Sequence, residues 1–279
     1  MGFEPKGAAL ASAAMKPLLA LASLLLALST PALAEAASSA AACFERGPEP
    51  DSVRAVRMTA RDRGGEKTIV VLRIYGKRSA EGLGQLFLRF EQPEGVRGTS
   101  LLVLEQKDGD SQIYLASPEL PTPRRVSGPA RADGIFRTDF SSEDLQRLQQ
   151  GWRPGAAEQK QLPDARVADR AVYVLETRPT DSAYERIVIS LDQESCLPLL
   201  VRFYEPGKAQ PRKELTTDPR SNVKHGERWV AHSALMRDLE NLTTTHLMVD
   251  SHAQDQLLPD GQFTVEGLER AVREGTKAP

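Results

Sequence analysis

Residues 67–75 read KTIVVLRIY and residues 85–91 read QLFLRFE. In both stretches an apolar side chain recurs at every second position. Successive side chains of a β-strand point to opposite faces, so a period of two predicts strands that bury one face each. The apolar positions are Val70, Leu72 and Ile74 in the first stretch and Leu86, Leu88 and Phe90 in the second.

The same alternation continues along the chain. It recurs at Ile113 and Leu115, at Val172 and Val174, at Ile187, Ile189 and Leu191, and at Leu199, Val201 and Phe203. Short turn signals such as Pro206-Gly207 punctuate the pattern and suit hairpin connections. Two further strands are expected near 228–238 and 242–250. The sequence therefore predicts a mainly β protein built on an antiparallel sheet of many strands.

Two segments carry helical signals. Residues 141–144 read SSED, a typical helix start, and Leu145, Leu148 and Trp152 follow at helical spacing, which predicts a short amphipathic helix over 142–150. A second helix is predicted over 264–274, with Val265, Leu268 and Val272 on one face. The proline-rich residues 118–134, PELPTPRRVSGPARADG, are expected to form a loop.

Residues 15–34, MKPLLALASLLLALSTPALA, have the order of a secretory signal. Lys16 precedes an apolar run that ends before Pro31, and Ala32-Leu33-Ala34 is a small-residue cleavage site. The run is about half the roughly 20 residues that a membrane span needs. We therefore expect residues 1–34 to be removed, with Met15 as an alternative start, and residues 35–51 to be a flexible lead-in.

The chain has two cysteines, Cys43 and Cys196. An exported protein meets an oxidising compartment, so the two are expected to form a disulfide. An acylated lipoprotein cysteine at Cys43 is the alternative, although Cys43 lies well beyond the apolar run. Their wide separation gives no zinc or redox motif.

Composition and motifs argue against several function classes. The formal net charge of −2 gives no indication of nucleic-acid binding. The sequence has no GxSxG, HExxH, P-loop or GxGxxG motif, so no enzymatic activity or cofactor is predicted. Glu143 and Asp144 are interpreted as helix-start charges favoured by the dipole, not as catalytic carboxylates. The spacing of His225, His232, His246 and His252 matches no ligand motif, so no metal site is predicted.

The order of these features resembles the outer-membrane lipoprotein-sorting family, which includes LolA-like and LolB-like carriers and RseB-like half-barrels. The resemblance is most specific in RFEQPEGVRGTSLL at 89–102 and TDFSSEDL at 138–145. It covers about residues 52–273 as one domain, which leaves 274–279 as a tail. The family implies an incompletely closed antiparallel barrel, a half-barrel, whose concave apolar face is covered by a few helices and holds acyl chains.

The resemblance also implies roles for particular residues. A lid would carry Leu145, Leu148 and Trp152. Arg89 and Arg97 are candidates to latch a helix or loop carbonyl over the apolar face, or to bind a lipid headgroup. The alternatives are a solvent-facing strand residue for Arg89 and a turn residue for Arg97. Alternation alone does not distinguish a lipid cavity from a filled core. The candidate cavity wall is Val70, Leu72, Ile74, Leu86, Leu88, Phe90, Ile187, Ile189, Leu199, Val201 and Phe203.

By this resemblance the protein is expected to be a periplasmic carrier or accessory protein of a Gram-negative bacterium. It would be a monomer that binds the acyl chains of a lipid or lipoprotein. Its membrane partner would be an inner-membrane transporter or an outer-membrane acceptor. The alternative is an RseB-like sensor that binds a regulatory protein, but those relatives carry a second domain, for which no room is expected after residue 273.

Overall fold

The computed structural model describes residues 1–2, 40–45, 51–107, 111–150, 158–180, 182–226 and 228–275. The chain divides into two compact units, Met1–Ala37 and Ser38–Pro279, and every element below belongs to the second unit. Almost all of the predicted signal, and Trp152 of the predicted lid, lie outside the described residues. Within the described part, no helix is both long enough and apolar enough to cross a bilayer.

One antiparallel sheet of 13 strands dominates the fold. Its first half is a meander of β1 (Ser52–Arg61), β2 (Lys67–Arg78), β3 (Gly84–Gln92), β4 (Ser100–Glu105), β5 (Ser111–Ala116) and β6 (Arg124–Val126). Its second half comprises β7 (Glu158–Val167), β8 (Arg170–Arg178), β9 (Arg186–Asp192), β10 (Pro198–Tyr204), β11 (Lys213–Thr217), β14 (Ser233–Asp238) and β15 (Thr243–Ala253).

The two halves meet where β1 pairs with β15, and the sheet ends at β6 and β7, which are not paired with each other. The predicted fold class, an antiparallel barrel that does not close, is thereby confirmed. The alternation predicted in β2 and β3 is confirmed as well, because Leu72 lies opposite Phe90 and Ile74 opposite Leu88. All four side chains are buried.

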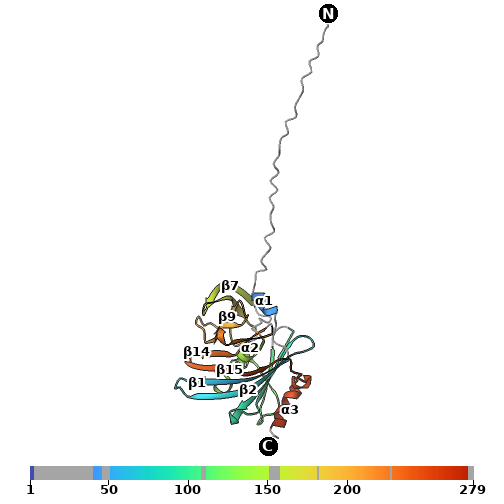
Figure 1. The fold of residues 1–279 in the computed structure, drawn as a ribbon, viewed down its shortest axis with the longest axis vertical. Helices are drawn as coiled ribbons and strands as arrows, with labels where there is room; N and C mark the ends of the chain where they lie inside the picture. Colours follow the sequence, from blue (N-terminus) through green and yellow to red (C-terminus); the bar gives the residue numbers. More distant parts are fainter. Residues whose placement is uncertain are drawn as a thin grey trace. The chain divides into compact units, whose positions relative to one another are not determined.

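Helices cover both faces of the sheet. On the inner face, α2 (Ser142–Gln150) packs on a large apolar cluster that includes Leu72, Leu88 and Phe203. On the outer face, α3 (Val265–Gly275) packs through Leu268 and Val272 on a second cluster. Figure 1 shows α2 within the curve of the sheet and α3 outside it. Both predicted helices are confirmed, and α3 begins one residue later than predicted.

Two other predictions need correction. The single strand expected at 228–238 is broken at His232 into β13 (Arg228–Ala231) and β14, because β13 pairs with β12 (Asn222–His225) in a separate two-stranded sheet. The loop expected at 118–134 contains β6 and the 3₁₀ turn η2 (Gly128–Arg131), because backbone pairing with β5 compensates for its poor strand composition.

Within the described residues, four other 3₁₀ turns connect the strands and helices. They are η1 (Glu94–Val96), η3 (Ile135–Arg137), η4 (Pro219–Ser221) and η5 (Asp260–Gln262).

The predicted disulfide is confirmed. Cys43 in α1 (Ala40–Glu45) is bonded to Cys196, in the connection between β9 and β10, with a Cα separation of 5.2 Å. The lead-in that was expected to be flexible therefore contains a short helix, cross-linked to the second half of the sheet.

We expect replacement of Cys196 by Ser to lower the free energy of unfolding by up to about 5 kcal/mol, since the bond closes a loop of 153 residues. Urea unfolding measures the loss. The Cys43→Ser/Cys196→Ser double variant should lose no more than either single variant, because all three remove one cross-link. Additive losses would show that the two cysteines stabilise the fold separately.

Candidate functional site

The eleven candidate wall residues all lie in the interior of the sheet. Their exposed fractions do not exceed 6%, and all except Leu199 belong to the inner cluster beneath α2. These side chains are therefore shielded from solvent in this structure. Use of this face for a lipid remains a proposal, and it requires that the covering elements move.

The cover of the inner face consists of α2 and the segment before it. Phe140 and Leu145 are fully buried in the inner cluster, and Leu148 packs against it while partly exposed. The helix begins with reciprocal capping bonds: the Ser141 amide donates to Asp144 Oδ2 at 2.9 Å, and the Asp144 amide donates to Ser141 Oγ at 3.1 Å. This capping box is the start that the SSED sequence predicts.

Asp144 also fastens α2 to the sheet. Its carboxylate is fully buried, and it accepts a hydrogen bond from Tyr184 Oη at 3.0 Å and one from Lys213 Nζ at 3.2 Å. Burial raises the pKa of Tyr184 well above its ordinary value, and the charges of Asp144 and Glu143 raise it further. The tyrosine therefore stays protonated and donates. A buried carboxylate is tolerated only with such partners.

Glu143 makes a second attachment. It is fully buried, accepts two hydrogen bonds from Arg147, at 2.6 and 3.2 Å, and accepts others from Ser182 Oγ and the Ala183 amide. The interpretation of Glu143 and Asp144 as helix-start charges was therefore incomplete. Both lie in the first turn of α2, but beyond the Glu143–Arg147 pair within the helix, their contacts tie it to the segment before β9 and to β11.

Residues 131–141, which we call the strap, lead into α2 across the inner face. Phe136 and Arg137 have φ angles of 49° and 63°, which is unfavourable for residues with a side chain. The Phe136 ring packs edge-on against Phe90, with the centroids 4.6 Å apart. The Thr245 hydroxyl donates to Asp139 Oδ2 at 2.7 Å, so β15 holds the end of the strap.

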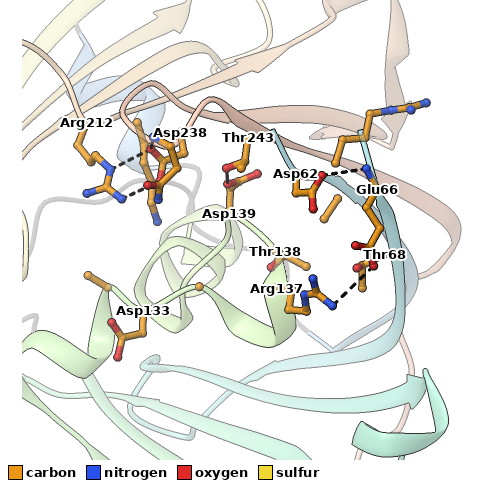
Figure 2. A pocket seen from close by; sticks show the side chains of 16 residues that line it. Asp62, Glu66, Thr68, Asp133, Arg137, Thr138, Asp139, Arg212, Asp238 and Thr243 are labelled. Atoms are coloured by element: carbon orange, nitrogen blue, oxygen red, sulfur yellow. Dashed lines mark hydrogen bonds and ion pairs between the residues drawn. The ribbon is translucent and has the colours of Figure 1, made fainter. Parts of the chain in front are cut away.

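A polar cavity of about 390 Å³ lies where the strap meets one rim of the sheet. The side chains that line the cavity come from the β1–β2 turn, from the strap, and from the adjacent ends of β11, β14 and β15 (Figure 2). Its labelled charges are largely paired: Arg212 forms a bidentate ion pair with Asp238, and Arg137 lies 3.8 Å from Glu66. The lining residues are Ala60, Arg61, Asp62, Glu66, Thr68, Ala132, Asp133, Gly134, Arg137, Thr138, Asp139, Arg212, Lys213, Asp238, Asn241 and Thr243.

The Arg212 pair joins the residue before β11 to the end of β14 at this rim. Burial alone would raise the pKa of Asp238, but the hydrogen bonds from Arg212 and from the Asn241 amide outweigh burial and hold that pKa below its ordinary value. Asp238 is therefore ionised at neutral pH. Lys213, adjacent in sequence to Arg212, lines the same cavity and reaches Asp144 beneath α2. The rim and the cover are thus linked through β11.

The two arginines singled out in the sequence lie apart from the inner face. Arg89 alternates with Leu88 and Phe90, so it points to the outer face, where its Nη1 donates to the Ala271 carbonyl of α3 at 3.0 Å. Arg97 follows η1 and forms an exposed ion pair with Glu94 at 2.9 Å. Neither contacts the strap or α2 in any described interaction. The Arg89 bond holds α3 on the outer face, and the role expected for Arg89, a latch over the apolar face or a headgroup ligand, stays a prediction.

An open antiparallel sheet whose apolar inner face is covered by a strap and helix defines a half-barrel fold. A family model described as "Uncharacterized protein" matches residues 82–270, and the chain belongs to that family. No curated protein matches the sequence.

Solved structures share the fold. An outer membrane lipoprotein-sorting protein domain from Vibrio parahaemolyticus is 24% identical, with a TM-score of 0.70, over 79% of this chain and 92% of its own. A DUF1329 family protein from Desulfovibrio piger is 22% identical, with a TM-score of 0.73, over 82% and 95%. A LolA superfamily protein from Nitrosomonas europaea is 17% identical, with a TM-score of 0.64, over 81% and 97%. The resemblance stated from the sequence is confirmed at the level of the fold.

Replacement of Lys213 by Met tests the attachment of α2. It leaves the Asp144 carboxylate buried without its cation, so we expect the free energy of unfolding to fall by about 3–5 kcal/mol. Urea unfolding measures this loss. The control is Arg73→Met, which breaks an exposed pair with Glu91 on the same sheet and should change stability by no more than about 1 kcal/mol. Equal, small losses in both variants would show that the buried pair does not hold the helix.

Proposed function

We propose that the protein is an exported carrier or accessory protein that binds the acyl chains of a lipid or lipoprotein between the inner face of its sheet and α2. The observation that carries this proposal is the way in which the cover is attached. The start of α2 is held by buried polar contacts of Glu143 and Asp144, and an apolar face lies directly beneath it.

Such an attachment suits a cover that opens. A net hydrogen bond contributes only about 0.5–1.5 kcal/mol, since water replaces the lost partner when the group becomes exposed. Water does not replace the lost contacts of the apolar face when that face is exposed. An acyl chain does replace them, and each methylene that it buries contributes about 0.8 kcal/mol. Opening of the strap and α2 is therefore unfavourable in water alone and becomes favourable when a chain enters.

The polar cavity extends the same proposal. It adjoins the strap and carries both acidic and basic side chains, so a polar headgroup could remain at the rim while the chain lies inside. The relationship to domains described as outer membrane lipoprotein-sorting and LolA superfamily proteins supports the carrier assignment. The disulfide and the predicted signal favour the periplasm.

The carrier would exchange its cargo with a membrane partner, an inner-membrane transporter or an outer-membrane acceptor. The alternative is a sensor that binds a regulatory protein on the same fold. The carrier and the sensor differ in whether the protein isolated from cells contains bound lipid. Mass spectrometry of an organic extract from protein purified out of the periplasm distinguishes them: a stoichiometric lipid supports the carrier, and an extract without lipid supports the sensor.

A matched pair of leucines on neighbouring strands tests the binding face. Leu88 on β3 lies in the inner cluster and Leu102 on β4 in the outer cluster, and both are fully buried. Replacement of either by Gln buries an amide and lowers stability by several kcal/mol. Only Leu88→Gln is expected to weaken binding of a dansyl-labelled fatty acid, by at least about tenfold, which corresponds to about 1.4 kcal/mol.

Fluorescence titration measures this affinity, and urea unfolding shows that both variants are folded under the assay conditions. Equal affinities in the two variants would exclude the inner face as the acyl site. Absence of fatty-acid binding by the unmodified protein would do the same.

A further inference from the structure

Three of the four histidines converge at one place. His225 ends β12, His232 lies between β13 and β14, and His252 is near the end of β15. One ring nitrogen from each lies within 4.8 Å of those of the other two. The His225 ring is stacked on His232, with centroids 6.0 Å apart, and meets His252 edge-on at 4.7 Å.

The backbone explains why these residues meet. The β12–β13 hairpin folds back beside the main sheet, and the His232 amide donates to the Ser221 carbonyl at 3.3 Å. The Val249 amide in turn donates to the His232 carbonyl at 2.9 Å, which joins this connection to β15. The cluster therefore lies where the small sheet meets the large one.

The ring nitrogens are suited to a metal ion. Nε2 of His225 and Nε2 of His232 are buried and accept or donate no hydrogen bond within the described part of the chain. Buried polar atoms without a partner are rare in native proteins, and an unfilled ion site is one reason for them. The neutral imidazole nitrogen is a preferred ligand of zinc, copper and nickel.

The geometry is close to that of a three-histidine site. Zinc–nitrogen bonds of about 2.0–2.1 Å place tetrahedral ligand atoms about 3.4 Å apart. The observed separations of up to 4.8 Å are larger than this, so binding requires the rings to turn toward a common centre. Three histidines leave a fourth position for water or another ligand. Arg54 of β1 lies opposite His252 in the strand register, and its positive charge would favour an anion there.

We propose that His225, His232 and His252 bind one divalent transition-metal ion, for which zinc is the best-suited candidate. The ion would join the β12–β13 hairpin to β15 and leave one coordination position open. The site lies on different residues from the acyl-binding face, and it does not depend on the proposed carrier function. The sequence predicted no metal site because the histidine spacings match no ligand motif, and such spacing does not show that the fold brings three of these residues together.

The fourth histidine provides a matched control. His246 lies on β15 as does His252, but its Nε2 is 2.7 Å from Ser233 Oγ, and it is not part of the cluster. The full chain, purified without a polyhistidine tag and treated with a chelator, is titrated with zinc sulfate by calorimetry. We expect one equivalent to bind. His225→Gln, His232→Gln and His252→Gln should each lose at least about 10-fold in affinity, and His246→Gln should bind as the unmodified protein does.

Cobalt(II) chloride provides a second measurement on the unmodified protein, because four-coordinate cobalt absorbs strongly in the visible range. We expect this absorption, its loss on addition of zinc, and a zinc-dependent rise in the thermal midpoint of the unmodified protein and His246→Gln only. Far-UV circular dichroism without metal shows whether each variant is folded. The proposal is overturned if the unmodified protein binds no equivalent of zinc, or if folded variants of the three histidines keep the affinity of His246→Gln.

Discussion

The pairing of β1 with β15 is the interaction on which the rest of the structure depends. It joins a meander from the first half of the chain to one from the second half, and so makes a single curved sheet from two smaller ones. The strand β15 then supplies Thr245 to the strap and His252 to the histidine cluster. Without this pairing neither the cover of the inner face nor the junction with the small sheet would have its support.

The two faces of the sheet are covered in physically different ways. On the outer face, α3 packs through apolar side chains, and Arg89 adds a bond to its backbone. On the inner face, α2 also buries Leu145, but its first turn carries two buried carboxylates with cationic and hydroxyl partners. A buried ion pair contributes little net stability compared with apolar packing, yet it fixes one geometry closely. The inner cover is therefore held by specific polar contacts in addition to apolar packing.

This difference links the fold to the proposed function. A carrier must keep its apolar face from water when empty and expose it to a chain when loaded, so its cover needs a closed state of limited stability. Under the proposed function the strap would meet that need, because Phe136 packs beside Phe90 from an unfavourable backbone conformation. The polar cavity at the rim lies next to the segment that would move.

The sequence by itself determined the strands with regular alternation, the start of α2 and the pairing of two cysteines, because period, capping and cysteine number are local or simple to count. It did not reveal β1, since the buried face of SVRAVRMTAR begins with the polar residues Ser52 and Arg54, so apolar alternation on that face is limited to Val56, Met58 and Ala60. Nor did it reveal the Asp144–Lys213 pair or the meeting of His225, His232 and His252. Those contacts join residues far apart in the chain, and only the register of β11 and β15 in the folded sheet brings them within reach of one another.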